Sequence, residues 1–109
     1  MGNRIDVMQG SLDLLILKAV ALEPMHGWGI SQRLEQLSTG VLRVQQGSLY
    51  PALQRLELQG WIRSEWSVTG DNRRAKYYEL TRSGRKQLER EQKEWERYTT
   101  AVKQVLESA

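Results

Sequence analysis

The stretch of sequence that decides the fold is Gln46-Gly47-Ser48-Leu49-Tyr50-Pro51-Ala52-Leu53-Gln54-Arg55-Leu56-Glu57-Leu58-Gln59-Gly60-Trp61. Four apolar residues in it recur at the i, i+3, i+4, i+7 spacing of a helix with one buried face: Leu49, Ala52, Leu53 and Leu56. Gly60 is typical of a residue that ends a helix. The stretch therefore predicts a helix whose inner side packs against the core and whose polar outer side is free to contact a binding partner.

The outer side of this helix carries groups that can contact DNA: Ser48, Tyr50, Pro51, Gln54 and Arg55. Hydroxyl, amide and guanidinium groups bind phosphate oxygens and base edges in a major groove. An ordinary amphipathic helix with a solvated polar face is the simpler alternative, and the helix alone does not exclude it.

The positive charge of the chain gathers just after this helix. The net charge is +3, but residues 1–62 hold equal numbers of acids and bases, whereas residues 63–86 hold seven Lys or Arg against three Asp or Glu. Residues 61–68 and 76–80 read as two strands, and the Gly, Asp and Asn between them favour a hairpin tip. Arg73, Arg74 and Lys76 then lie at or beside the tip, as expected of a device that contacts phosphate.

Two helices and a short strand are predicted before the central stretch. The first helix covers about residues 7–22 and is apolar on more than one side, so it needs two packing partners, and the second could be another subunit. The next helix opens after His26 and runs for about ten residues. Its expected inward stripe is Trp28, Ile30, Leu34 and Leu37. Residues 41–44 suit only a small edge strand.

The last predicted helix runs from about Arg82 to Leu106, with Thr81 as its N-cap. Its apolar residues follow a heptad with Glu91 as the one misfit: Leu88, Trp95, Tyr98, Val102, Val105 and Ala109. This seam needs a cover, which is either a second copy of the chain or the first helix of the same chain. We expect the second copy.

Composition excludes several classes of protein. The chain has 109 residues, which suit one domain, and no cysteine, so we expect no disulfide, no thiolate metal site and a reducing, cytoplasmic setting. No stretch is apolar enough to cross a membrane. One histidine and no phosphate-binding glycine loop argue against an enzyme, a metal site or a cofactor. His26 is more simply explained as a helix cap.

The order of the predicted elements is that of a winged helix-turn-helix, mainly α with a small β-hairpin and a long C-terminal helix. Four motifs resemble, in order, those of the PadR family of bacterial transcriptional regulators: His26-Gly27-Trp28-Gly29-Ile30, Gly47-Ser48-Leu49-Tyr50-Pro51-Ala52-Leu53-Gln54-Arg55-Leu56-Glu57, Gly60-Trp61-Ile62, and Arg74-Ala75-Lys76-Tyr77-Tyr78-Glu79-Leu80-Thr81-Arg82-Ser83-Gly84. The chain resembles the short subfamily with a single C-terminal helix. Residues 1–81 would be the DNA-binding part and residues 82–109 the dimerisation helix.

The resemblance implies a homodimeric repressor that binds a palindromic operator. Ser48, Tyr50 and Pro51 would enter the groove, and Arg73, Arg74 and Lys76 would hold phosphate. The first and last helices would form the dimer interface through Leu12, Leu15, Leu88, Trp95, Val102 and Val105. Trp95 occupies the place where multidrug-sensing relatives stack flat aromatic ligands, and Tyr98 would lie beside it in the dimer groove. Plain packing of the dimer explains the two rings equally well.

Two questions stay open at this point. Gln45 and Gln46 are poor helix caps, so the central helix starts either there or at Ser48; in the first case Pro51 removes an internal hydrogen bond. A winged-helix module that senses a ligand or binds a protein, without reading DNA, is the alternative function. Salt dependence of DNA binding would separate the two functions.

Overall fold

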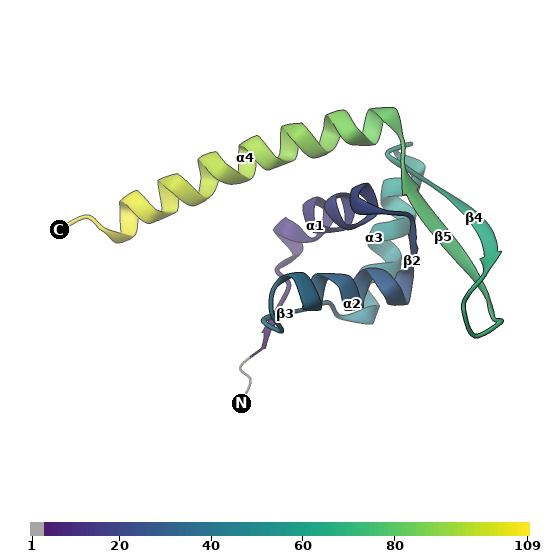
Figure 1. Ribbon diagram of the computed structural model, residues 1–109. Helices are drawn as coiled ribbons and strands as arrows, with labels where there is room; N and C mark the ends of the chain where they lie inside the picture. The colour runs from purple at the N-terminus through teal and green to yellow at the C-terminus, as the bar shows by residue number, and fades with distance from the viewer. Residues whose placement is uncertain (1–3) are drawn as a thin grey trace.

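The computed structural model describes residues 4–109, and it has the mainly helical winged-helix architecture that the sequence predicts (Figure 1). The elements are β1 (Ile5–Asp6), α1 (Gln9–Leu22), β2 (Met25–His26), α2 (Gly27–Leu37), β3 (Leu42–Arg43), α3 (Gln46–Leu58), β4 (Ile62–Val68), β5 (Arg74–Leu80) and α4 (Arg82–Leu106). Strands β2, β5 and β4 form an antiparallel sheet in that order.

The core lies where α1, α2 and α3 meet the base of the sheet. Its largest fully buried side chains come from four elements: Ile16, Leu17, Ile30, Leu49, Leu53, Leu56 and Ile62. The predicted inner face of α3 is confirmed, because Leu49, Ala52, Leu53 and Leu56 are all buried. Gly60, with a φ of +79°, ends the turn after α3 in the left-handed region that glycine tolerates best.

The chain before α1 forms a strand that the sequence did not reveal. Ile5 N donates to Val41 O at 2.7 Å and Val7 N donates to Arg43 O at 2.9 Å, so β1 pairs in parallel with β3. The predicted start of the first helix at residue 7 is therefore wrong by two residues. A strand of two residues is too short to show a periodicity in the sequence. The predicted end of the first helix before Pro24 is confirmed, because α1 ends at Leu22.

Helix α2 has the predicted cap but not the predicted inward stripe. Gly29 N donates to Nδ1 of His26 at 3.0 Å, which confirms His26 as a cap, and Tyr77 packs edge-on against its ring. Ile30 and Leu34 are buried, but Trp28 is 58% exposed and Leu37 is also exposed. At 3.6 residues per turn, Trp28 lies about 200° from Ile30 around the helix, so the two cannot share a face.

Helix α3 begins at Gln46, two residues before Ser48. Ser48 N and Leu49 N both donate to Gln45 O at 3.0 Å, while no side chain caps the helix. Pro51 therefore lies inside the helix and has no N–H to offer the carbonyl of Gly47. The helix therefore starts at Gln46 and not at Ser48. The carbonyl of Gly47 is left without its helical hydrogen bond on the outer side of the first turns.

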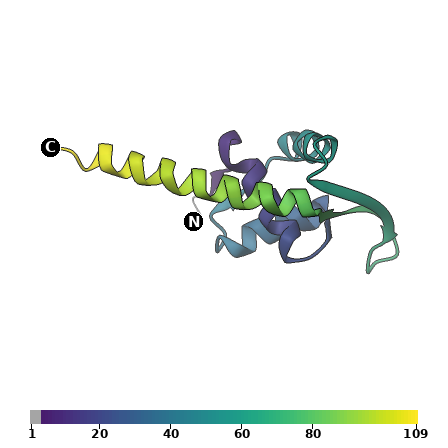
Figure 2. The ribbon, with the colours of Figure 1, turned by 90° about the horizontal axis from the view of Figure 1, so that it is seen from above.

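The β4–β5 hairpin, called the wing below, and α4 leave the body in opposite directions (Figure 2). Strand β5 begins two residues earlier than expected, at Arg74, and Asn72 at the tip has a φ of +66°. Helix α4 has the predicted bounds and cap, since Gly84 N donates to Oγ1 of Thr81 at 3.0 Å. Its first half lies along α1, and its second half continues past the body to the C terminus.

Candidate nucleic-acid interface

The polar side of α3 divides into an outer crest and two flanks. Gly47, Pro51, Gln54 and Leu58 follow one another at helical spacing along the crest, and all are exposed, Leu58 by 83%. One flank faces the wing, where Oγ of Ser64 donates to Oε2 of Glu57 at 2.5 Å. The other flank faces α1. Only the crest and its first turn are therefore free to enter a groove.

Arg55 lies on the flank toward α1. Its Nη2 is 2.5 Å from Oδ1 of Asp13, and the Asp13 side chain is less exposed than that of Arg55. The sequence prediction placed the Arg55 guanidinium among the groups that can contact DNA, but helical spacing cannot show a partner 42 residues away. Ser48, Tyr50, Pro51 and Gln54 are all exposed, as a groove contact requires.

Asp13→Asn is expected to raise the affinity for duplex DNA about threefold and to steepen its salt dependence by up to one released counterion, because Arg55 then keeps a charge without a carboxylate beside it. An exposed pair contributes little to stability, so the unfolding midpoint should hardly change. Fluorescence anisotropy over a salt series measures the affinity. Glu94→Gln is the matched control, since it releases Arg97 on α4, away from α3; equal gains in both variants would contradict the role of Asp13.

Tyr50 faces the start of α2 and the wing rather than the crest. A Cβ added at Gly27 would lie 2.8 Å from the Tyr50 hydroxyl, so only glycine at this position lets the ring lie where it does. The ring is still half exposed. It borders a cleft of about 390 Å³ whose other walls are Trp28 of α2 and Trp66, Arg74 and Lys76 of the wing. Tyr50 of α3 and the wing therefore border one common cleft.

The three basic residues predicted at the hairpin tip do not lie on one side of the wing. Strand alternation and the Trp66↔Lys76 register place Arg74 and Lys76 on the same side of the wing as Trp66, the side toward the cleft. Arg73 has the opposite parity and lies 3.9 Å from Oδ2 of Asp71. A hydrogen bond with Thr69 lowers the pKa of Asp71, so this carboxylate is ionised at neutral pH and offsets the Arg73 charge.

Hydrogen bonds and one ion pair connect the wing and its base to α3 and α4. Besides the Ser64–Glu57 bond, Lys76 Nζ lies 3.9 Å from Oε1 of Glu57. At the other end, Thr81 and Ser83 both donate to Gly60 O, at 2.6 and 3.0 Å. Burial, with the Glu57 carboxylate nearby, raises the pKa of Tyr78, so its phenol adds no negative charge to the cleft at neutral pH. The wing thus has a fixed angle to α3.

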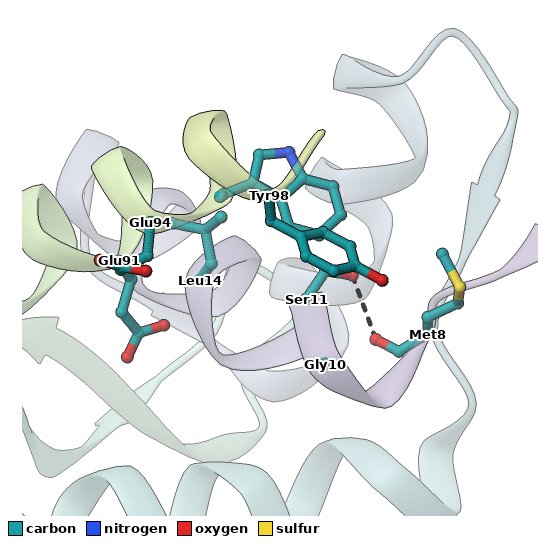
Figure 3. Close-up of a pocket in the computed structure, with 8 residues that line it drawn as sticks. Met8, Gly10, Ser11, Leu14, Glu91, Glu94 and Tyr98 are labelled. Atoms are coloured by element: carbon teal, nitrogen blue, oxygen red, sulfur yellow. Dashed lines mark hydrogen bonds between the residues drawn. The ribbon is translucent and has the colours of Figure 1, made fainter. Parts of the chain in front are cut away.

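A second hollow lies between the start of α1 and the middle of α4, where Trp95 and Tyr98 come together (Figure 3). The two ring centroids are 6.1 Å apart and the rings are inclined by 36°. The hollow, of about 590 Å³, has further walls that the sequence prediction did not name: Met8, Gly10, Ser11, Leu14, Glu91 and Glu94. Among these walls, only Glu91 had a signal in the sequence, because it interrupts the apolar heptad. Its Oε2 accepts a hydrogen bond from Nε2 of Gln87 at 2.7 Å.

Two residues predicted for the dimer interface lie in the chain's own core. Leu12 is 3% exposed and Leu88 is 7% exposed, because α4 packs against α1 of the same chain at this point. They have almost no surface left for a second subunit, so that assignment is corrected. Leu15 and Trp95 are partly exposed, and Val102 and Val105 are exposed. The apolar heptad seam of α4 is thus covered by α1 at Leu88, near the start of α4, and uncovered beyond Trp95.

Residues 16–90 match the family model of the PadR-like transcriptional regulators. The chain belongs to the PadR-like family. PadR-like proteins are DNA-binding transcriptional regulators and not enzymes. The present chain is therefore a DNA-binding transcriptional regulator and not an enzyme. The winged helix, the exposed crest of α3 and the basic wing are the parts that such a regulator needs.

Known proteins similar to the chain agree with the PadR assignment. The transcriptional regulator Rv3488 of Mycobacterium tuberculosis is 36% identical over 83 residues, which cover 76% of this chain and 74% of the relative. The crystal structure of a PadR-like transcriptional regulator from Bacillus cereus superposes with a TM-score of 0.77 at 28% identity, covering 93% of this chain and 96% of that one. The crystal structure of smu.1704 from Streptococcus mutans superposes with a TM-score of 0.81 at 31% identity. The match covers 95% of this chain and 93% of that one.

Within residues 4–109 of this PadR-like chain, no three potential metal ligands of the His, Cys, Asp or Glu type come together. No helix in the same range is both long and apolar enough to cross a bilayer.

Proposed function

We propose that the chain is a homodimeric repressor that binds a two-fold symmetric operator and leaves it when a flat aromatic ligand occupies the hollow at Trp95 and Tyr98. Residues 1–81 read the DNA and residues 82–109 join the two copies, as in a short PadR-like protein with a single C-terminal helix. A regulator of this kind works in the cytoplasm, where the bacterial chromosome is.

The observation that carries the DNA-binding proposal is the common cleft between α3 and the wing. Tyr50 on α3 and Arg74 and Lys76 on the wing border the same cleft, which lies on the flank of α3 next to its exposed crest. A duplex whose major groove takes the crest of α3 brings a phosphate backbone toward this cleft. Pro51 and Gln54 then face base edges, while the wing bases face phosphate.

The dimer is proposed from the uncovered part of the α4 seam. Tyr98 is 63% exposed, and Val102, Val105 and Leu106 continue the apolar row on a helix that projects from the body. A second copy packed along this row buries it by two-fold symmetry and presents two reading helices. Two such helices engage two half-sites, so the operator is expected to be palindromic.

The effector is proposed from the shape and chemistry of the α1–α4 hollow. Trp95 and Tyr98 offer flat aromatic surface, and the hollow's volume of about 590 Å³ suits a drug-sized molecule. The hollow adjoins the uncovered seam, so a ligand there touches the proposed dimer interface directly. A ligand that fits one relative position of the two subunits better than another shifts the population between them, which provides the release from DNA.

Selection of bound fragments from random genomic DNA by the purified chain, followed by anisotropy over a salt series, tests this function. We expect one enriched palindromic site and an affinity that falls steeply with salt, since each neutralised phosphate contributes about 0.9 to the logarithmic slope. Binding that is weak and nearly indifferent to salt would instead favour a module that senses a ligand or a protein.

Tyr50→Ala is expected to weaken binding to the selected site about tenfold and binding to random duplex about twofold, because a residue in the cleft between α3 and the wing matters most when the crest sits in register. The same anisotropy assay measures both affinities. Leu37→Ala, an exposed apolar change on the far end of α2, is the control. Equal losses on both duplexes would show that Tyr50 positions the protein without contributing to sequence recognition.

A further inference from the structure

Trp66 is a large aromatic side chain that the fold leaves uncovered. It is 57% exposed on β4, toward the outer end of the wing, although Ile62 on the same side of that strand is fully buried. Its ring instead lies beside a cation: Cζ of Arg74 is 5.0 Å from the ring centroid. The exposed ring therefore has a partner that is itself one of the basic residues of the wing.

Strand register explains why this pair forms. Trp66 lies opposite Lys76, and Val68 lies opposite Arg74, so Trp66 and Arg74 are diagonal neighbours on the cleft side of the wing. Diagonal neighbours in an antiparallel pair lie within reach of aromatic and long side chains. A guanidinium that stacks on an indole keeps the N–H groups at its edge free, and these are the groups that bind phosphate in a fork.

The three basic residues of the wing differ in what they already contact. Arg73 lies 3.9 Å from the ionised Asp71, and Lys76 lies 3.9 Å from Glu57. Arg74 has no carboxylate within ion-pair distance in the part of the chain that the structure describes, and its contact is with a neutral ring. A phosphate therefore meets Arg74 without first displacing an anion. The side chain is also held in place before DNA arrives, which reduces the entropy lost on binding.

We propose that Trp66 positions Arg74 as the phosphate-binding group of the wing, and that Arg73 contributes little. Trp66 is a positioning residue: it acts through the guanidinium and not by its own contact with DNA. This inference rests on the proposed DNA-binding function and assigns unequal roles to the basic residues at the tip. Arg74 then offers its guanidinium edge to the DNA backbone at the rim of the cleft.

A double-mutant cycle on the full-length chain tests the proposal, with the selected operator duplex as the probe. Arg74→Ala is expected to weaken binding about tenfold and to lower the logarithmic salt slope by about 0.9, the value for one phosphate. Trp66→Ala should weaken binding about fourfold, with a smaller drop in slope, because Arg74 keeps its charge but loses its fixed position. In the Arg74→Ala background, Trp66→Ala should cost nothing more.

Arg73→Ala provides the matched comparison, because it removes the same charge from the neighbouring residue. We expect it to weaken binding less than twofold and to combine additively with Trp66→Ala. Trp66→Phe keeps a ring under Arg74 and should restore most of the affinity and slope. Thermal unfolding of each variant, followed by circular dichroism, checks that the hairpin is intact.

Three results would overturn the proposal while leaving the DNA-binding function in place. They are an undiminished effect of Trp66→Ala in the Arg74→Ala background, a loss from Arg73→Ala equal to that from Arg74→Ala, and a Trp66→Phe variant as weak as Trp66→Ala. A wild-type chain that selects no duplex would overturn the DNA-binding function itself, and this inference with it.

Discussion

Gly84→Ala is expected to destabilise the chain by about 3 kcal/mol or more, enough to consume much of the stability of a small domain. Gly84 lies buried in the first turn of α4, and a Cβ there would overlap the carbonyl oxygen of Trp61. The atom in the way belongs to the backbone, so no side-chain rotation relieves the overlap. Thr81 N also donates to this carbonyl at 3.1 Å, so α4 must move away and lose that bond.

Urea unfolding followed by far-UV circular dichroism measures the effect. Gly10→Ala is the matched control, because Gly10 is also in a first helical turn and an added Cβ there meets no atom within 4 Å. Alanine favours a helix over glycine by about 0.5–1 kcal/mol, so this control should be neutral or slightly stabilising. If Gly84→Ala unfolded at the same urea concentration as the wild type, the close docking of α4 on the start of β4 would be wrong.

Val102→Glu is expected to convert the protein to a monomer and to weaken operator binding by on the order of 100-fold. Val102 is 37% exposed on the apolar row of α4, so the folded monomer tolerates a carboxylate there, whereas a two-fold interface would bury two of them face to face. The loss in affinity follows because a dimer binds its second half-site at a high effective concentration and a monomer does not.

Sedimentation velocity and anisotropy on the same samples measure the two effects together. Gln104→Glu adds the same charge two residues further on, about 200° around the helix from Val102, and should change neither the assembly nor the affinity. A Val102→Glu variant that stays dimeric would place the interface elsewhere. A monomeric variant with full operator affinity would show that the two reading helices act independently.

Periodicity predicted the parts of this fold in which one face of one element is buried. Leu49, Ala52, Leu53 and Leu56 are buried because a helix that packs on a single core shows its spacing directly in the sequence. The cap roles of His26 and Thr81 were equally predictable, since each is a local contact across three residues. The sequence also placed the wing, because its hairpin has turn residues at the tip and charge on both sides.

Contacts between distant segments were not predictable in the same way. The Asp13–Arg55 pair spans 42 residues, and β1 has only two residues to pair with β3. Leu12 and Leu88 illustrate a related limit: an apolar residue on a helix with two apolar sides does not show which side meets its own chain and which meets another. The split of the wing bases likewise depends on strand register, which decides that Arg74 meets Trp66 while Arg73 meets Asp71.

The anchoring of α4 at Gly60 and Trp61 gives the helix the properties of a lever. Its 25 residues span about 37 Å at 1.5 Å each, and its fixed end adjoins both α3 and the wing. If two copies join along the far half, a tilt of about 5° between them shifts one reading helix by about 2 Å relative to the other, more than half of the 3.4 Å step between base pairs. A ligand bound between the two copies near Trp95 would then move the two reading helices out of register with successive half-sites of the duplex.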